Sequence, residues 1–271
     1  MGVKRGKSSR KVGLALGTGA ARGLAHIGVL KVLEQEGIPV DMMAGTSMGA
    51  VVGAFYAYGQ SIKAIEKLAI DLGAKRLNSF IDLSLPKTGL IRGRKINETL
   101  RAVIDGAEFS DLKIPFACVA TDIDCGEEVV FKEGLVWEAI RASSSIPVVL
   151  AVVKWQGRYL VDGTLVNPVP VSTVRALGAD FIIAVNVIPH REITGETAPN
   201  IFAVIMQTVN ISAYGLIKAS LAGADIVIEP RVDDIGYADF KHAREFILRG
   251  EMAAKKAIPE IKRSLSFSKK G

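Results

Sequence analysis

Ser47 is the residue of this chain whose setting most suggests chemistry. It lies at the centre of Gly45-Thr46-Ser47-Met48-Gly49, a G-x-S-x-G pentapeptide between an apolar run at 42–44 and a small-residue run at 50–54. This pattern predicts a buried strand, a sharp turn and a helix. A serine on such a turn points its hydroxyl outward, and the helix N-terminus favours developing negative charge. Ser47 is therefore either a nucleophile or part of a small-residue turn.

A serine nucleophile also needs donors for an oxyanion. Gly17-Thr18-Gly19-Ala20 ends a predicted strand and opens a predicted helix, so its backbone N–H groups can converge on an anion. A dinucleotide-binding loop would be the alternative. The spacing argues against it, because Arg22 stands where that motif needs its third glycine.

The sequence offers two kinds of base for Ser47. Of three histidines, His26 lies on a mostly apolar helix face before the serine, and His242 lies in a charged helix, so we expect a packed residue and a surface residue. His190 follows a predicted strand end and could complete a Ser–Asp–His triad. An α/β-hydrolase, however, usually places several strands before its elbow, and here only one predicted strand precedes the elbow strand.

Asp162 is the alternative base. It ends a predicted strand and is followed by Gly163. We expect this strand to belong to the parallel sheet, where a strand-end carboxylate lies at the edge at which active sites form, although Asp-Gly is also common in simple turns. These residues alone leave both interpretations open.

The composition predicts one α/β domain. The chain has 271 residues, 49% of them hydrophobic, with no internal repeat and no Pro/Ser-rich linker. We expect a basic tail at 1–11, a single domain at 12–265 and a C-terminal tail at 266–271. Two cysteines in a chain of this length do not make a disulfide framework, so we expect a reducing, cytoplasmic compartment.

Alternating apolar runs and helical periodicities predict a largely parallel sheet between helices. One strand runs into Ser47, and the others are expected at 12–16, 116–121, 128–131, 149–155, 158–161, 181–187 and 225–228. Helices are expected at 21–36, 48–58, 61–72, 94–105, 136–142, 171–176, 200–221 and 239–264, with a loop or lid at 73–92.

Two segments suggest partners. Residues 63–101 carry nine Lys or Arg against four Asp or Glu, which indicates either a solvated basic face or a surface for anionic lipid headgroups or nucleic acid. Residues 200–224 contain one charge, Lys218. That segment fits a buried helix or a homo-oligomer contact, or alternatively an acyl-chain groove or membrane-touching surface.

Together these motifs resemble the patatin-like phospholipase family, particularly its small bacterial members. The matching segments follow one order over about residues 12–260, and they are 14–30, 45–49, 120–122, 139–147, 159–163 and 167–168. The resemblance implies a three-layer α/β/α sandwich with a mainly parallel central sheet. It implies a phospholipid or other lipid ester as the partner. No metal-ligand spacing is visible, and we expect no metal, no cofactor and no nucleic-acid partner.

The resemblance also assigns roles to the site residues. It implies a Ser–Asp dyad without histidine, with Ser47 as nucleophile and Asp162 as general base. The oxyanion would be held by backbone N–H groups at Gly19 and Ala20, in a loop structured by Arg22. The implied activity is hydrolysis of lipid esters through an acyl-enzyme, as a phospholipase A, lysophospholipase or carboxylesterase, with peripheral contact at the inner membrane surface.

The chain departs from the family pattern at the site. Thr18 and Ala20 replace two glycines of the loop, and Thr164 stands where Gly or Ala usually follows Asp162-Gly163. Backbone N–H groups remain at 18 and 20, so the oxyanion site is kept if their backbone angles suit Thr and Ala. No reacting group is lost. A regulatory or scaffold protein with little turnover is the second interpretation.

Overall fold

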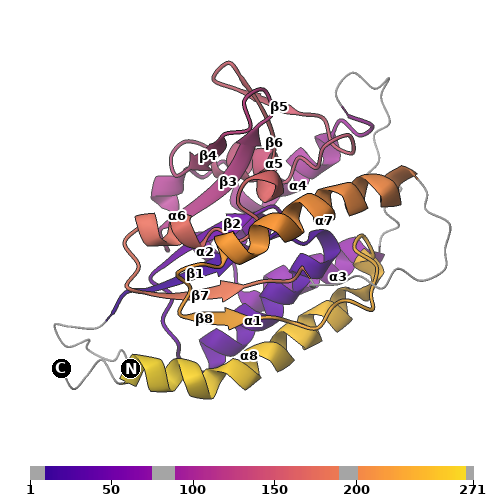
Figure 1. Ribbon diagram of the computed structural model, residues 1–271. Helices are drawn as coiled ribbons and strands as arrows, with labels where there is room; N and C mark the ends of the chain where they lie inside the picture. Colours follow the sequence, from indigo (N-terminus) through magenta and orange to yellow (C-terminus); the bar gives the residue numbers. More distant parts are fainter. Residues whose placement is uncertain (1–9, 75–88, 189–200, 267–271) are drawn as a thin grey trace.

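A mixed sheet forms the centre of the fold, as the computed structural model shows for residues 10–74, 89–188 and 201–266 (Figure 1). In these ranges the sheet has eight strands, in the order β5-β6-β3-β2-β1-β7-β8, with β4 also pairing with β3. The strands are β1 (Val12–Leu16), β2 (Met42–Thr46), β3 (Phe116–Asp122), β4 (Glu128–Phe131), β5 (Val153–Trp155), β6 (Arg158–Asp162), β7 (Phe181–Val185) and β8 (Ile226–Ile228).

The sheet has a parallel and an antiparallel part. Strands β3, β2, β1, β7 and β8 pair in parallel, and β1, β2, β3 and β7 are buried along their whole length. Burial on both faces explains their continuous apolar sequences. Strands β4, β5 and β6 pair antiparallel. The expectation that Asp162 ends a parallel strand is therefore wrong, because β6 runs antiparallel to β3 and Asp162 pairs with Ala120.

Helices cover both faces of the sheet, which confirms the three-layer α/β/α sandwich. The helices are α1 (Ala25–Gln35), α2 (Met48–Tyr58), α3 (Ile62–Ala74), α4 (Arg94–Ile104), α5 (Val136–Ser143), α6 (Val171–Ala176), α7 (Ile201–Ser220) and α8 (Ala243–Ser266). The main core joins α1, α2, α5 and α8 to one face, and a second core joins α6 to the other. A small third cluster holds α7 against Ile188.

Most predicted elements lie within two residues of the observed ones, and three differ. The helix expected at 21–36 begins as a 3-10 turn, η1 (Ala20–Leu24), before α1. The helix expected at 239–264 likewise begins with η5 (Phe240–His242). The strand expected at 149–155 is present only as β5, because Val148 has a φ of +67° and Leu150 makes only an isolated parallel bridge to Ile91.

Helix α7 crosses in front of the sheet in the view of Figure 1 and contacts the 3-10 turn η4 (Gly163–Leu165). It buries Ala213 and Ile217 against Ile188 and leaves Val204 and Ile211 exposed. No helix in the described ranges is long and apolar enough to cross a membrane. The tails at 1–9 and 267–271, and most of the loop or lid expected at 73–92, lie outside the described residues.

Candidate active site

Ser47 occupies the sharp turn between β2 and α2. Its backbone has φ 55° and ψ −121°, a conformation that L residues rarely adopt. The flanking glycines allow the close contacts of this turn: a Cβ on Gly45 would lie 2.5 Å from Ala50 N, and one on Gly49 would lie 2.2 Å from Leu16 O. The predicted strand, turn and helix are thus present, and Ser47 is held where a nucleophile elbow would hold it.

The Ser47 hydroxyl donates to the carboxylate of Asp162. The Oγ to Oδ2 distance is 2.6 Å, and both residues are buried. The backbone N–H of Thr164 donates to the other carboxylate oxygen, Oδ1, at 2.9 Å. Gly163 lets this turn lie against β3, because a Cβ there would be 2.3 Å from Val119 O. A buried hydroxyl and a buried carboxylate, 115 positions apart in the chain, therefore meet directly.

Burial makes Asp162 a stronger base than an ordinary aspartate. Desolvation raises its pKa to about 6, against the opposing effect of hydrogen bonds from Ser47 and Thr164. The carboxylate is thus ionised at neutral pH, yet its pKa lies closer to the pH at which it would have to accept a proton. The carboxylate is therefore both in hydrogen-bond contact with the Ser47 hydroxyl and more basic than an ordinary aspartate.

Two of the backbone N–H groups around the start of η1 already have acceptors. Thr18 N–H donates to Pro168 O at 2.9 Å, and Ala21 N–H donates to Tyr237 O at 3.1 Å. Within the described part of the chain, the N–H groups of Gly19 and Ala20 have no backbone acceptor. Gly19 has no room for a side chain, since its Cβ would lie 2.3 Å from Val187 Cγ2. Gly19 and Ala20 are therefore the donors that can serve an oxyanion.

Thr18 and Ala20, which stand where the family pattern has glycine, differ in their backbone φ angles. Ala20 adopts a φ of +44°, in the left-handed region that favours glycine, whereas Thr18 does not have a positive φ. Arg22 is buried, and its Nη2 and Nε donate to Ile235 O at 2.8 and 3.1 Å. Its guanidinium also lies over the ring of Tyr237. Arg22 thus fixes the loop against residues 235–237.

The described histidines lie apart from this chemistry. His26 is buried, its Nε2 is 2.7 Å from Gly17 O, and burial lowers its pKa to about 4, so it is a neutral, packed residue. His242 is about half exposed beside Asp239. His190 lies outside the described residues. In the described ranges, the acceptor of the Ser47 hydroxyl is therefore a carboxylate and not an imidazole.

Two site residues were not singled out from the sequence. The Oγ of Ser143 accepts the Ser47 N–H at 3.0 Å, which anchors the strained turn. Thr164 was noted only as a departure from the family pattern, but its hydroxyl lies 2.6 Å from Asp162 Oδ1. Ser143 belongs to the motif segment at 139–147, so the resemblance gave a signal for it. No motif near Thr164 in the sequence indicated the hydrogen bond that its hydroxyl makes with Asp162.

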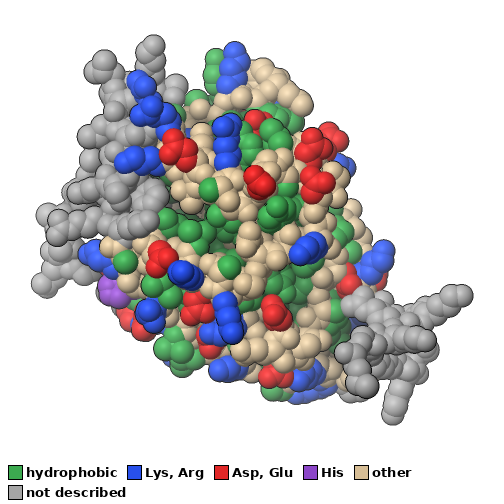
Figure 2. Space-filling model, turned by 180° about the vertical axis from the view of Figure 1, so that it is seen from behind, with side chains coloured by type: hydrophobic (Ala, Val, Ile, Leu, Met, Phe, Trp, Pro, Cys, Tyr) green, Lys and Arg blue, Asp and Glu red, His purple; other side chains and the backbone are tan. Residues whose placement is uncertain are grey.

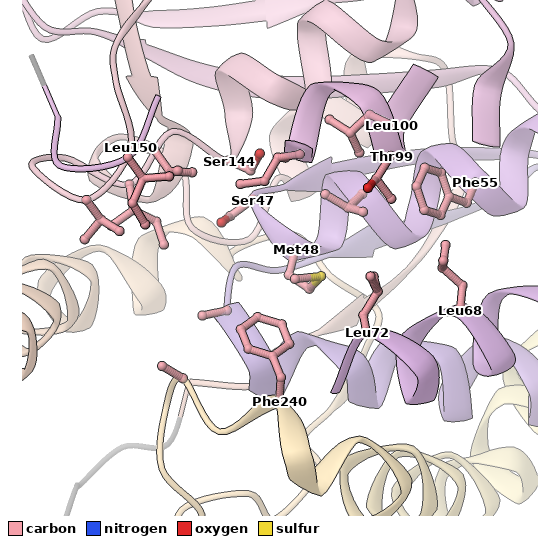
Figure 3. A pocket seen from close by; sticks show the side chains of 17 residues that line it. Ser47, Met48, Phe55, Leu68, Leu72, Thr99, Leu100, Ser144, Leu150 and Phe240 are labelled. Carbon is pink, nitrogen blue, oxygen red and sulfur yellow. The ribbon is translucent and has the colours of Figure 1, made fainter. Parts of the chain in front are cut away.

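An apolar cavity of about 280 Å³ opens beside Ser47. Ser47 and Ser144 lie near each other on its wall, and apolar side chains of α2, α3 and η5 surround the space next to them (Figure 3); Ala20 also lines the cavity. The remaining lining residues are mostly aliphatic or aromatic, and they include Met48, Val51, Phe55, Leu68, Leu72, Ile91, Ile96, Leu100, Ile146, Val149, Leu150 and Phe240. The hydroxyl of Ser47 thus faces a space suited to a hydrocarbon chain.

Comparisons with known proteins find relatives of this chain. The family model for patatin-like phospholipase matches residues 14–175, which is more than half of the chain. An uncharacterised NTE family protein of Mycobacterium tuberculosis is 40% identical over 67% of this chain and 50% of its own length. The lysophospholipase NTE1 of Debaryomyces hansenii is 36% identical over 66% of this chain and 12% of its own.

The solved structures show the fold. The crystal structure of VipD from Legionella pneumophila matches 93% of this chain and 67% of that chain, with a TM-score of 0.53 and 13% sequence identity. The chain spans half the length of its mycobacterial relative and about an eighth of the yeast protein. The family model and the shared motifs place this chain in the patatin-like phospholipase family, a family of lipid ester hydrolases.

Proposed function

We propose that this protein hydrolyses carboxylic esters of lipids with Ser47 as nucleophile and Asp162 as general base. The observation that carries the proposal is the 2.6 Å hydrogen bond between Ser47 Oγ and Asp162 Oδ2 beside an apolar cavity. A nucleophile in hydrogen-bond contact with a base is the arrangement that covalent catalysis requires. The family membership supports the same chemistry.

The reaction has two halves. In the first, Asp162 takes the Ser47 proton while Oγ attacks the ester carbonyl, and the N–H groups of Gly19 and Ala20 stabilise the oxyanion. The carbonyl–oxygen bond then breaks, and the leaving alcohol or lysolipid takes the proton from Asp162. In the second, Asp162 accepts a proton from water, which attacks the acyl-enzyme. The acid leaves, and the proton returns to Ser47.

The cavity selects for the acyl part of a substrate. Its walls offer carbon surface almost throughout, so burying a hydrocarbon chain there is favourable in proportion to the area removed from water. The name of the yeast relative, a lysophospholipase, supports a single-chain phospholipid as a substrate to test. Phospholipase A and general carboxylesterase activity are the neighbouring assignments in the same class.

We infer that the rim of this cavity meets a lipid surface. Leu90 and Val148 are 40% and 52% exposed, are joined by a backbone hydrogen bond, and directly precede the cavity residues Ile91 and Val149. The exposed basic residues Arg92, Arg94 and Lys95 follow within five positions. On the face drawn in Figure 2, hydrophobic side chains gather in the middle, with Lys, Arg, Asp and Glu side chains around them. The three basic side chains beside the rim suit anionic headgroups.

Turnover of a lysophospholipid tests the proposed function. Wild type is expected to release fatty acid from lysophosphatidylcholine, and Ser47→Ala to lose this activity by roughly 10⁴-fold or more. His190→Ala is the matched control for the base and is expected to retain activity. Activity that survives Asp162→Asn but disappears in His190→Ala would replace the dyad by a triad. A wild type without turnover on any lipid or short-chain ester would favour the regulatory or scaffold interpretation.

A further inference from the structure

The hydroxyls of Thr18 and Thr164 meet behind the carboxylate of Asp162. Thr164 Oγ1 lies 2.6 Å from Thr18 Oγ1 and 2.6 Å from Asp162 Oδ1. All three side chains are buried, with exposures of 1%, 1% and 2%. These threonines are two of the positions at which the sequence departs from the family pattern. They lie 146 positions apart in the chain, and the fold makes them one feature.

The number of protons fixes the direction of these bonds. Each hydroxyl has one proton to donate, and an ionised carboxylate can only accept. Thr164 must therefore donate to Asp162, because the two oxygens, 2.6 Å apart, would repel each other with no proton between them. The lone pairs of the Thr164 hydroxyl are then left to accept the proton of the Thr18 hydroxyl. The result is a hydrogen-bond chain that runs from Thr18 through Thr164 to Asp162 Oδ1.

This hydrogen-bond chain fixes which way the Asp162 carboxylate faces. The terminal torsion of an aspartate is broad and does not hold its two oxygens in place by itself. Here Oδ1 accepts both the hydroxyl and the N–H of Thr164, which leaves Oδ2 directed at Ser47. Thr18 also belongs to the loop of Gly19, so the chain connects the base to the oxyanion donors.

We propose that Thr18 and Thr164 are positioning residues that hold the Asp162 carboxylate against Ser47 and tie it to the oxyanion loop. The inference rests on the proposed function and adds two residues to it. Misplacement of a reacting group by about 1 Å can cost roughly 10²-fold in rate, so such support matters for a base that works by contact.

Valine substitutions test the chain, because valine keeps the branched shape and removes the hydroxyl. Thr164→Val is expected to raise the titration midpoint of the Asp162 carboxyl by about one unit, since a hydrogen bond to the charged form is lost. The carboxyl ¹³C shift reads this midpoint without any substrate. The rate of fluorophosphonate labelling at high pH is expected to fall about tenfold as the carboxylate loses its orientation. Thr164→Ser, which returns the hydroxyl, should restore both values.

Thr18→Val should act in the same direction and less strongly, because it removes the outer hydroxyl of the chain. In a Thr164→Val background it should add almost nothing, which a double-mutant cycle measures. Thr121→Val is the matched control: its buried hydroxyl donates to the backbone oxygen of Asp162 at 2.8 Å and not to the carboxylate. It should leave the carboxyl midpoint unchanged even if it lowers stability.

The proposal is overturned if Thr164→Val has the wild-type midpoint and labelling rate, or if the effects of the two valine variants simply multiply. A change in Thr164→Val that serine does not reverse would also overturn it, since bulk and not the hydroxyl would then be the cause. Failure of the proposed function looks different, because the wild type itself would remain unlabelled at Ser47.

Discussion

Replacing Asp162 by asparagine should stabilise the protein while abolishing its chemistry. The carboxylate is buried, and desolvation raises its pKa to about 6 from an ordinary value of 3.8. An acid whose pKa is higher in the folded than in the unfolded state costs stability once the pH is high enough to ionise it in both. Asparagine keeps an oxygen for the bonds from Thr164 and carries no charge to desolvate.

The size of the effect depends on pH in a defined way. Below pH 3.8 the carboxyl is protonated in both states and costs nothing; the cost grows as the pH rises from 3.8 to 6 and then levels off. At 1.36 kcal/mol per unit, the pKa values predict a cost of about 3 kcal/mol at pH 7.5 and about 1 kcal/mol at pH 4.5. Asp162→Asn should recover these amounts.

Urea unfolding of the two proteins at pH 7.5 and pH 4.5 measures both numbers. The variant should have the higher unfolding midpoint at pH 7.5, an unchanged slope, and a gain that shrinks at pH 4.5. The same samples should show loss of fluorophosphonate labelling in the variant. A variant that is no more stable than wild type at pH 7.5, or whose gain does not depend on pH, would refute the view that Asp162 is a desolvated base.

Three further predictions concern the site and its rim. The labelling rate of wild type should rise with pH through a midpoint near 6, because Asp162 must be ionised to accept a proton, and a flat profile from pH 5 to 8 would contradict this. Ala20→Gly should raise the unfolding free energy by roughly 0.5–1 kcal/mol by relieving the left-handed backbone, and lower stability in urea would contradict that origin. Leu90→Glu should weaken co-sedimentation with anionic liposomes, and Met252→Glu, at an exposed position of α8, should not; equal binding by both variants would exclude the rim as the lipid contact.

The local parts of the site could be predicted from the sequence. The elbow at Ser47 is formed by residues that are adjacent in the sequence. Its strand and the bounds of α2 therefore follow from glycine spacing and apolar runs. The role of His26 as a packed residue followed in the same way from its helix face. These predictions needed only neighbours along the chain.

What depends on distant pairing could not be predicted. Asp162 was assigned to a parallel edge, but β6 pairs antiparallel with β3, and strand direction is decided by the connection through β4 and β5. Thr18 and Thr164 were noted separately as departures, and only the fold brings their hydroxyls together. The cavity is likewise assembled from segments as far apart as Val51 and Phe240.

Covalent labelling with a fluorophosphonate, read by intact mass, tests the central claim most directly. Ser144→Ala is the matched control for Ser47→Ala, because Ser144 lines the same cavity while its hydroxyl donates to Ile140 O at 2.7 Å and not to Asp162. One adduct is expected on wild type and on Ser144→Ala, and none on Ser47→Ala. An adduct that persists on Ser47→Ala, or a wild type that takes none, would contradict Ser47 as the activated nucleophile.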